Sequence, residues 1–228
     1  MDPDAKHARI LYNSQFKNYY REIDAYVVYQ NIKKAVYNEL GDLKGKKILF
    51  AGCGNGSECL RAIKQGARVT GIDVSDQEIA EAKKNYPKIS FQIMDMEKTD
   101  FPARSFHVIV CIMAMMYKKN LTKVIQEFYR ILKPKGIVVL AVPHPIRKMF
   151  KYNHLNYFVK GRKTEIWRGV NRFNYYRIIE DYIDEISKSD LIITGLKEPR
   201  PIAGKGELRY SETQYPHALI LKLIKLAK

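Results

Sequence analysis

The sequence predicts an α/β fold built on a doubly wound, mainly parallel sheet, and two observations carry the prediction. Between residues 46 and 140, short apolar runs typical of strands alternate with stretches typical of helices. The runs at 108–112 and 137–142 are apolar at every position, as strands buried on both faces of a sheet are. Because the crossovers between parallel strands are right-handed, helices should cover both faces of this sheet.

This part of the chain should contain five strands and three helices in alternation. Ser75 is a predicted helix N-cap because Glu78 follows three residues later, and Pro87 marks where that helix ends. The predicted strands are 47–51, 68–73, 89–94, 106–112 and 136–142, and the predicted helices are 56–65, 75–85 and 120–132.

The segments before and after this alternation have a different character. Aromatic and apolar residues recur near helical spacing over 14–40, which predicts a helical segment that either covers the carboxyl edge of the sheet or packs on its core. Residues 143–170 show weak periodicity and are interpreted as an insertion. Beyond it, the pattern predicts a helix at 174–187, strands at 191–196 and 215–224, and a loop at 200–206.

Composition excludes several classes of protein. Hydrophobic residues make up 46% of the chain, enough for a real core, and no apolar run reaches the roughly 18 residues of a membrane span. The amino terminus lacks the apolar segment of a signal peptide, so we expect a soluble, cytoplasmic protein. Cys53, Cys59 and Cys111 show no CxxC spacing, so we expect neither a disulfide framework nor a metal site.

Positive charge is concentrated in one segment of a chain whose net charge is +16. Residues 143–178 hold nine basic residues and one acid, Glu165, for a local net charge of +8. Such a segment attracts nucleic acid, an anionic membrane surface or an acidic small substrate. A generally basic surface without a specific partner accounts for the same composition, so these alternatives stay open at this point.

The chemistry-bearing pattern is a strand that breaks into three alternating glycines, Gly52, Gly54 and Gly56, followed by a second strand that ends in Asp73. Backbone without side chains lets a ligand approach closely, and a carboxylate on the next strand can accept both ribose hydroxyl protons. A dinucleotide-binding loop requires its third glycine where Ser57 stands. The pattern therefore favours an adenosine cofactor without a pyrophosphate, such as a sulfonium nucleoside, over NAD.

These residues resemble the class I S-adenosylmethionine-dependent methyltransferases, specifically the small-molecule branch called type 11. The resemblance covers most of the chain and rests on the glycine run 51–56, the strand end 71–75, the adenine-side segment 91–96 with Phe101-Pro102, and the helix and turn at 125–136. It implies a Rossmann-like, mainly parallel seven-stranded sheet with an antiparallel last strand, an N-terminal helical lid and an insertion after strand 5. The implied cofactor is S-adenosyl-L-methionine.

The resemblance also implies how one domain over 1–228 is divided. Its expected parts are an N-terminal helical lid at 1–45, a cofactor-binding core at 46–142, a substrate-covering insertion at 143–173, and a C-terminal helix and strands at 174–228.

Cofactor contacts can be carried over from the resemblance residue by residue. Gly52, Cys53 and Gly54 should lie under the methionine and ribose, and Asp73 should accept from the ribose hydroxyls, with Val74 following it. On the remaining sides, Asp95 should meet the adenine amino group with the Met96 amide beside the ring, and Cys111 should present its backbone to the methionine moiety.

The chain departs from the family pattern at Phe50 and His107, where acids are usual. The acid at the first position helps to orient the methionine amine, and its loss leaves open a protein that binds the cofactor without catalysis. A tyrosine face attracts a cation, and Tyr20, in the amino-terminal tyrosine position of the family, is our candidate substitute.

The acceptor side is less defined. His144, directly after the fifth strand, resembles a histidine-proline element of the branch and is our candidate base, while Tyr117 and Trp167 are candidate walls of the acceptor pocket. Ordinary turn and packing roles account for the same three residues. We expect a small organic acceptor, aromatic or anionic, methylated at oxygen, nitrogen or carbon; a tRNA or rRNA methyltransferase that uses 143–178 is the alternative.

Overall fold

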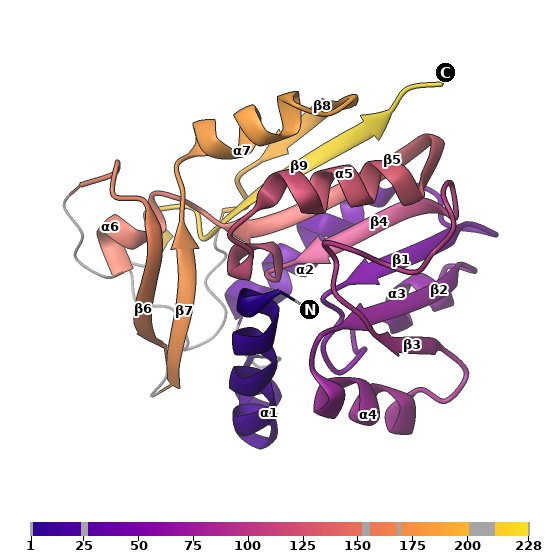
Figure 1. The fold of residues 1–228 in the computed structure, drawn as a ribbon, viewed down its shortest axis with the longest axis horizontal. Coiled ribbons are helices and arrows are strands. Elements are labelled where there is room, and N and C mark those ends of the chain that lie inside the picture. The colour runs from indigo at the N-terminus through magenta and orange to yellow at the C-terminus, as the bar shows by residue number, and fades with distance from the viewer. Residues whose placement is uncertain (1, 24–26, 152–155, 168–169, 201–212, 228) are drawn as a thin grey trace.

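The computed structural model describes residues 2–23, 27–151, 156–167, 170–200 and 213–227. Its centre is a seven-stranded sheet of order β3-β2-β1-β4-β5-β9-β8 (Figure 1). The strands are β1 (Lys47–Ala51), β2 (Arg68–Asp73), β3 (Ser90–Ile93), β4 (Phe106–Ile112), β5 (Leu132–Pro143), β8 (Leu191–Lys197) and β9 (Ala218–Lys225). Strands β1 to β5 pair in parallel, and β9 lies antiparallel between β5 and β8. The predicted mainly parallel sheet with an antiparallel last strand is confirmed.

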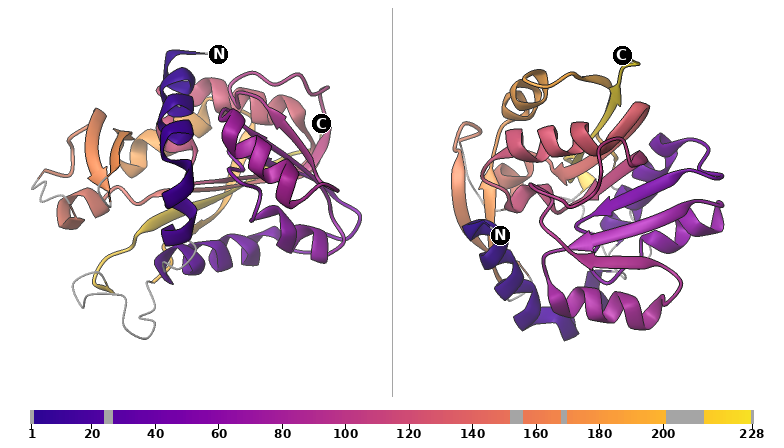
Figure 2. Two further views of the ribbon diagram at one scale, coloured as in Figure 1. Left: turned by 90° about the horizontal axis from the view of Figure 1, so that it is seen from below. Right: turned by 45° about the vertical axis from the view of Figure 1, so that its right-hand side comes forward.

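Helices cover both faces of the sheet (Figure 2), which confirms the doubly wound architecture. Alternate residues of β1 point to opposite faces, as strand geometry requires. Ile48 and Phe50 join the core under one group of helices, and Leu49 and Ala51 join the core under the other. The first group is α2 (Val27–Leu40), α3 (Cys59–Lys64) and α4 (Asp76–Asn85), and the second is α5 (Leu121–Ile131) and α7 (Ile179–Ser187).

Capping side chains fix where two of these helices begin. The Ser75 hydroxyl accepts from Glu78 N at 3.1 Å, as predicted, and the Asn120 carbonyl oxygen accepts from Lys123 N at 3.1 Å. Helix α5 ends one residue before β5 begins, so the expected turn residues around Pro134 lie inside the strand. There Lys135 has a φ of 60°, and the pairing of β5 with β4 shifts register. The residues expected to turn the chain before the strand therefore form an irregularity within it.

The amino-terminal segment forms two helices rather than the single segment predicted over 14–40. Helix α1 (Pro3–Ile23) begins eleven residues earlier than expected because the Asp2 carboxylate accepts from Asp4 N at 2.8 Å and Pro3 occupies the first helical position. Figures 1 and 2 show α1 between α4 and the hairpin described next, at the carboxyl end of the sheet. Helix α2 instead packs on one face of the sheet, with Val36 fully buried.

The segment after β5 forms a short helix, α6 (Arg147–Lys151), and an antiparallel hairpin of β6 (Gly161–Trp167) and β7 (Val170–Tyr176). The predicted helix at 174–187 is wrong over its first residues, because Asn174, Tyr175 and Tyr176 pair with β6 and α7 begins at Ile179. No helix within the described ranges has the length and apolar character needed to cross a membrane.

Candidate cofactor site

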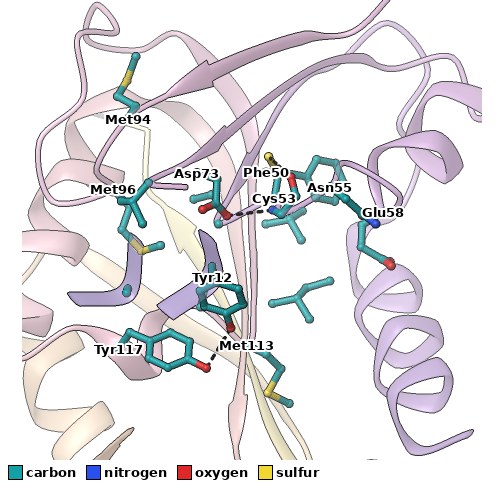
Figure 3. A pocket seen from close by; sticks show the side chains of 18 of the residues that line it. Tyr12, Phe50, Cys53, Asn55, Glu58, Asp73, Met94, Met96, Met113 and Tyr117 are labelled. Atoms are coloured by element: carbon teal, nitrogen blue, oxygen red, sulfur yellow. Dashed lines mark hydrogen bonds between the residues drawn. The ribbon is translucent and has the colours of Figure 1, made fainter. Parts of the chain in front are cut away.

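A pocket opens at the carboxyl ends of β1, β2 and β4, beside the central strand where the order of the sheet reverses (Figure 3). Ligands of open α/β sheets bind at this switch point. The empty space of the pocket is about 990 Å³, including the open solvent at its mouth. Its walls come from α1, the glycine loop after β1, the end of β2, the segment after β3, and the 3-10 helix η1 (Met115–Tyr117).

The glycine loop forms one wall, and its backbone favours glycine at two positions. Gly52 and Gly54 have φ values of 75° and 51°, in the left-handed region that favours glycine. A Cβ on Gly52 would lie 2.3 Å from the Cβ of Ala114. The amides of Gly52 and Cys53 both donate to Ile72 O, at 2.8 and 2.9 Å, which ties the loop to β2.

Asp73 lies at the end of β2 with its carboxylate held by backbone. Its Oδ2 accepts from Gly54 N at 2.9 Å, and its Oδ1 accepts from Ser75 N at 3.0 Å. Burial raises the pKa of Asp73, and the amides of Ser75 and Gly54 oppose that rise. A carboxylate has about four acceptor positions, so these bonds leave capacity for hydroxyl groups of a ligand in the pocket.

On the side of β3, a buried lysine gathers three carboxylates. Lys118 is 3% exposed, and its Nζ lies 2.7 Å from Asp2, 2.5 Å from Asp95 and 3.5 Å from Glu97. Burial lowers the pKa of Lys118, but its hydrogen bonds to Asp2 and Asp95 outweigh burial and raise it. The same contacts lower the pKa of Asp2 to about 2, against the effect of its own burial. The cluster joins the N-cap of α1 to the pocket wall.

The opposite end of the pocket holds Phe50 and Glu58 (Figure 3). Phe50 is 3% exposed and packs in the core below α2, α3 and α4, so it supplies no charge to the pocket. Glu58 precedes α3, lines the same pocket, and forms an ion pair with Lys33 of α2. Glu58 therefore supplies a carboxylate on this side of the pocket. It precedes α3, whereas the acid that the sequence lacks would stand at Phe50 on β1.

Two tyrosines close the pocket at the end nearest the hairpin. The hydroxyl groups of Tyr12 on α1 and Tyr117 on η1 lie 3.0 Å apart, with their rings edge to face (Figure 3). The Arg172 guanidinium of β7 donates to the Tyr117 oxygen at 2.6 Å. The pocket wall at this end is therefore aromatic, with a buried cation directly behind it.

Comparison with known proteins relates this chain to methyltransferases. Residues 48–136 match the family model described as a methyltransferase domain. Residues 48–136 are therefore similar to a methyltransferase domain, the class that the sequence resemblance predicts. It is 34% identical over 143 residues to a demethylmenaquinone methyltransferase of Chlorobaculum tepidum, a match that covers 62% of this chain. The chain spans about 56% of the length of that relative.

Solved methyltransferase structures share the fold. An S-adenosylmethionine-dependent methyltransferase of Mesorhizobium loti superposes with a TM-score of 0.75 at 23% identity, over 89% of this chain and 100% of that chain. A magnesium protoporphyrin IX methyltransferase of Synechocystis, solved with bound S-adenosylmethionine, superposes with a TM-score of 0.68 at 15% identity over 99% of this chain and 98% of that chain. S-adenosylmethionine is the cofactor of this class of methyltransferase.

Most of the cofactor residues expected from the sequence lie together in this pocket. Those that line it are Gly52, Cys53, Gly54, Asp73, Val74 and Met96, together with the candidate acceptor residue Tyr117. Asp95 is engaged by Lys118 at the edge of the pocket, and it accepts from Glu97 N at 3.0 Å. The expected contact of Asp95 with adenine therefore stays a prediction, and it requires Asp95 to bond both the adenine amino group and Lys118.

Two of the three cysteine thiols bear directly on the cofactor predictions. Cys111 lies fully buried within β4 and does not line the pocket, while its neighbours Val110, Ile112 and Met113 do. Burial raises the pKa of Cys111 to about 12 and holds that of Cys53 well above its usual range. Both side chains are therefore protonated thiols that contribute packing rather than nucleophiles.

His144 lies outside this pocket, at the end of β5. Its Nδ1 accepts from Ile146 N at 3.1 Å, so the ring proton sits on Nε2, which donates to Glu198 Oε1 at 2.7 Å. Burial lowers the pKa of His144, and Glu198 opposes that shift. The imidazole is therefore neutral near pH 7, and it lines a second, smaller pocket beside α6.

Two further candidates cannot be placed from their side chains. Tyr20 belongs to α1 and Trp167 to the end of β6, but both side chains lie outside the described residues. The sequence reasoning missed Lys118, Glu58 and Tyr12, which line the pocket. Only Tyr12 had a sequence signal, an aromatic residue in the segment before the core.

Proposed function

We propose that this chain transfers the methyl group of S-adenosylmethionine to a small organic acceptor. The observation that carries the proposal is the glycine loop and Asp73 held together at the switch point of the sheet, with Gly54 N donating to Asp73 at 2.9 Å. This arrangement supplies close backbone approach and a hydroxyl acceptor, the two features an adenosine cofactor needs.

The pocket residues suggest one placement of the cofactor. Asp73 binds the ribose hydroxyls, the adenine lies toward Met96, and the methionine moiety lies toward Phe50. On this placement Glu58 takes over the role of the missing acid and binds the methionine amine, sharing its charge with Lys33. The sulfonium then faces the aromatic end of the pocket, where the negative face of a tyrosine ring stabilises a cation.

Methyl transfer is an in-line displacement, so the enzyme chiefly aligns the acceptor atom with the methyl group and excludes water. Tyr12 and Tyr117 close the pocket on that side, and Arg172 fixes the Tyr117 hydroxyl. An acceptor that must lose a proton needs a base. His144 stays our prediction for that role, although in this structure it faces Glu198 and not the cofactor pocket.

Two cations of the basic segment are withdrawn from an RNA-binding surface, while Lys160, Arg162 and Lys163 stay exposed. Lys148 and Arg172 are 4% and 8% exposed, so both charges lie inside the protein and are withdrawn from an open nucleic-acid surface. The aromatic wall with a cation behind it supports the prediction of an aromatic or anionic acceptor. Similar proteins whose names give a small-molecule substrate include the demethylmenaquinone and magnesium protoporphyrin IX methyltransferases. A cytoplasmic location stays a prediction, to be checked by cell fractionation.

The first experiment is calorimetric titration with S-adenosylmethionine and S-adenosylhomocysteine, with Asp73→Asn as the comparison variant. Absence of binding at millimolar concentration would overturn the proposal. The second experiment supplies methyl-labelled cofactor to a cell extract and identifies labelled products by mass spectrometry. Labelled small molecules would support the proposal, and labelled RNA would show that the acceptor is RNA instead. Cofactor binding with no labelled product would indicate a binding protein without catalysis.

A further inference from the structure

A second pocket lies between the end of β5, α6, β7 and α7, and it shares no lining residue with the cofactor pocket. It encloses about 370 Å³ of empty space up to its mouth. Among its lining residues are three cations, Arg147, Lys148 and Arg177, and no carboxylate belongs to its described lining. A cavity lined by one sign of charge concentrates ions of the opposite sign.

Lys148 carries the argument because it is buried and no carboxylate of the described residues forms an ion pair with it. It is 4% exposed, and its Nζ donates to the carbonyl oxygen of Val159 at 2.7 Å between the rings of Tyr157 and Tyr176. Within the described residues it forms no ion pair. Burial lowers its pKa, and Asp181 opposes that shift only from a distance while pairing with Lys160 at 2.5 Å.

Two further buried polar atoms of the lining also lack partners among the described residues. They are Arg147 Nε and Asn174 Oδ1, and the Asn174 side chain belongs to a residue that is 6% exposed. An asparagine amide can turn to present its NH₂ group, so Asn174 can serve as a donor. The Arg177 guanidinium donates to the carbonyl oxygens of Lys118, Lys119 and Tyr175.

Buried cations and unsatisfied donors are unfavourable unless a ligand completes them. We propose that this pocket binds an oxyanion group, a carboxylate or a phosphate, held by Lys148 and Arg147 with Asn174 as an additional donor. His144 lines the same pocket as a neutral imidazole, because its Nδ1 accepts from Ile146 N while its Nε2 donates to Glu198. The proposal does not depend on methyl transfer.

The pocket adjoins the acceptor side of the cofactor site through β7. Asn174 and Arg172 lie two residues apart on this strand and so share one face, and Arg172 contacts Tyr117 of the cofactor pocket. The bound group therefore has two sources to distinguish: the acidic end of the methyl acceptor, or a free anion that binds independently.

The test measures binding of inorganic phosphate and of acetate by calorimetry and thermal unfolding in a buffer without other oxyanions. The wild-type chain should bind at least one of them and unfold at a higher temperature. Lys148→Met should lower that affinity at least tenfold, and Arg147→Gln should lower it several-fold. Lys197→Met, on an exposed strand residue, is the matched control and should bind as the wild type does.

Two parallel measurements separate this proposal from the proposed function. Saturating S-adenosylhomocysteine should leave phosphate binding unchanged, and Lys148→Met should bind S-adenosylhomocysteine as the wild type does. Equal anion affinity in the wild type and Lys148→Met, absence of anion binding to the wild type, or displacement of the anion by S-adenosylhomocysteine would overturn the proposal.

The source of the group follows from the extract assay. Phosphate that inhibits labelled methyl transfer in the wild type but not in Lys148→Met assigns the pocket to the acidic end of the acceptor. Phosphate that binds without inhibiting assigns it to a free anion. Both outcomes support an oxyanion site.

Discussion

At the scale of single residues, the cofactor pocket depends on backbone positions that tolerate no side chain and on carboxylates that other groups hold in place. Gly52, Gly54 and Asp73 had a local sequence signal, because they directly follow apolar strands. Lys118 and Glu58 had no such signal, because their partners Asp2 and Lys33 are remote in sequence. Nothing in the sequence distinguishes Lys118 or Lys33 within a set of 40 basic residues. Contacts of that kind appear only in the folded chain.

Gly52→Ala should abolish cofactor binding and destabilise the chain. The left-handed backbone alone costs about 1–2 kcal/mol, and the added Cβ would also meet Ala114 at 2.3 Å. Gly41→Ala is the matched control, because Gly41 has a φ of 68° but open space around its Cβ position. Chemical denaturation should show the larger loss for Gly52→Ala. Equal losses in the two variants would contradict a steric role for position 52.

Asp73→Asn should weaken binding of S-adenosylhomocysteine about 10- to 100-fold, the range expected when hydrogen bonds to a charged group lose that charge. Because the pKa of Asp73 is raised, its carboxylate gains a proton at a higher pH than an ordinary aspartate does. Wild-type affinity should therefore fall as the pH is lowered toward that raised value. Calorimetry across pH should show this fall in the wild type and a flatter profile in Asp73→Asn.

Glu58→Gln tests whether Glu58 binds the amino acid end of the cofactor. If Glu58 binds the methionine amine, the variant should bind S-adenosylhomocysteine about tenfold more weakly. It should bind methylthioadenosine, which lacks the amino acid part, with unchanged affinity. Asp73→Asn serves as the comparison, because it should weaken both ligands. Equal loss of both ligands in Glu58→Gln would assign Glu58 to packing of α3 and not to the amine.

At the scale of elements, α1 is a separate wall of the cofactor site that polar contacts attach to its surroundings. Its start is tied to Lys118 through Asp2, and its middle is tied to α4 by Asn13 and Arg9, which both bond Asp76. Elements with a clear cap, such as α4, could be placed from the sequence. The helix predicted at 174–187 overran β7, because a hairpin strand is decided by its pairing partner and not by its own pattern.

Asp2→Asn should loosen this wall. Asparagine still caps the helix but no longer pairs with Lys118, so we expect a loss of about 1–2 kcal/mol and faster release of S-adenosylhomocysteine. Because the folded pKa of Asp2 is lowered to about 2, its contribution is present above the unfolded value and is lost as the pH falls through 2. The difference in stability between the wild type and Asp2→Asn should therefore vanish as the pH falls from 3.8, the ordinary pKa, to below about 2.

Arg9→Met is the control for this prediction, because it breaks the exposed ion pair between α1 and α4. Both partners are 41% exposed and the pair is screened by solvent, so its loss should cost less stability than the loss of the Asp2 contact. Denaturation and stopped-flow release measurements compare the two variants. A larger effect in Arg9→Met than in Asp2→Asn would show that α1 is held chiefly at its middle.

At the scale of the whole molecule, the sheet brings together residues from β1, β2 and η1 that are far apart in the chain. Local patterns gave the strands, but the placement of β9 between β5 and β8 was implied only by the family resemblance. Strand order depends on which edges pair in space, and no window of sequence encodes that choice. The same limit applies to the second pocket, whose lining comes from α6, β7 and α7.

Cofactor binding should stabilise this assembly as one unit. S-adenosylhomocysteine at about 100 times its dissociation constant should add about 2.7 kcal/mol, which corresponds to a rise in Tm of about 5–11 °C for a domain of this size. Thermal unfolding measures the shift, with NAD at the same concentration as the control. A comparable shift with NAD would contradict the reading of Ser57 as a departure from the dinucleotide loop.

All three cysteines of the chain are buried, and burial holds the pKa of each thiol above its usual value. Maleimide reagents, which need an accessible thiolate, should therefore leave the folded protein unlabelled. A single new cysteine at Ile10, which is 70% exposed on α1, would then take up a fluorophore selectively. Because the three native cysteines stay unlabelled, fluorescence from position 10 would report in real time how α1 responds to binding and release of the cofactor.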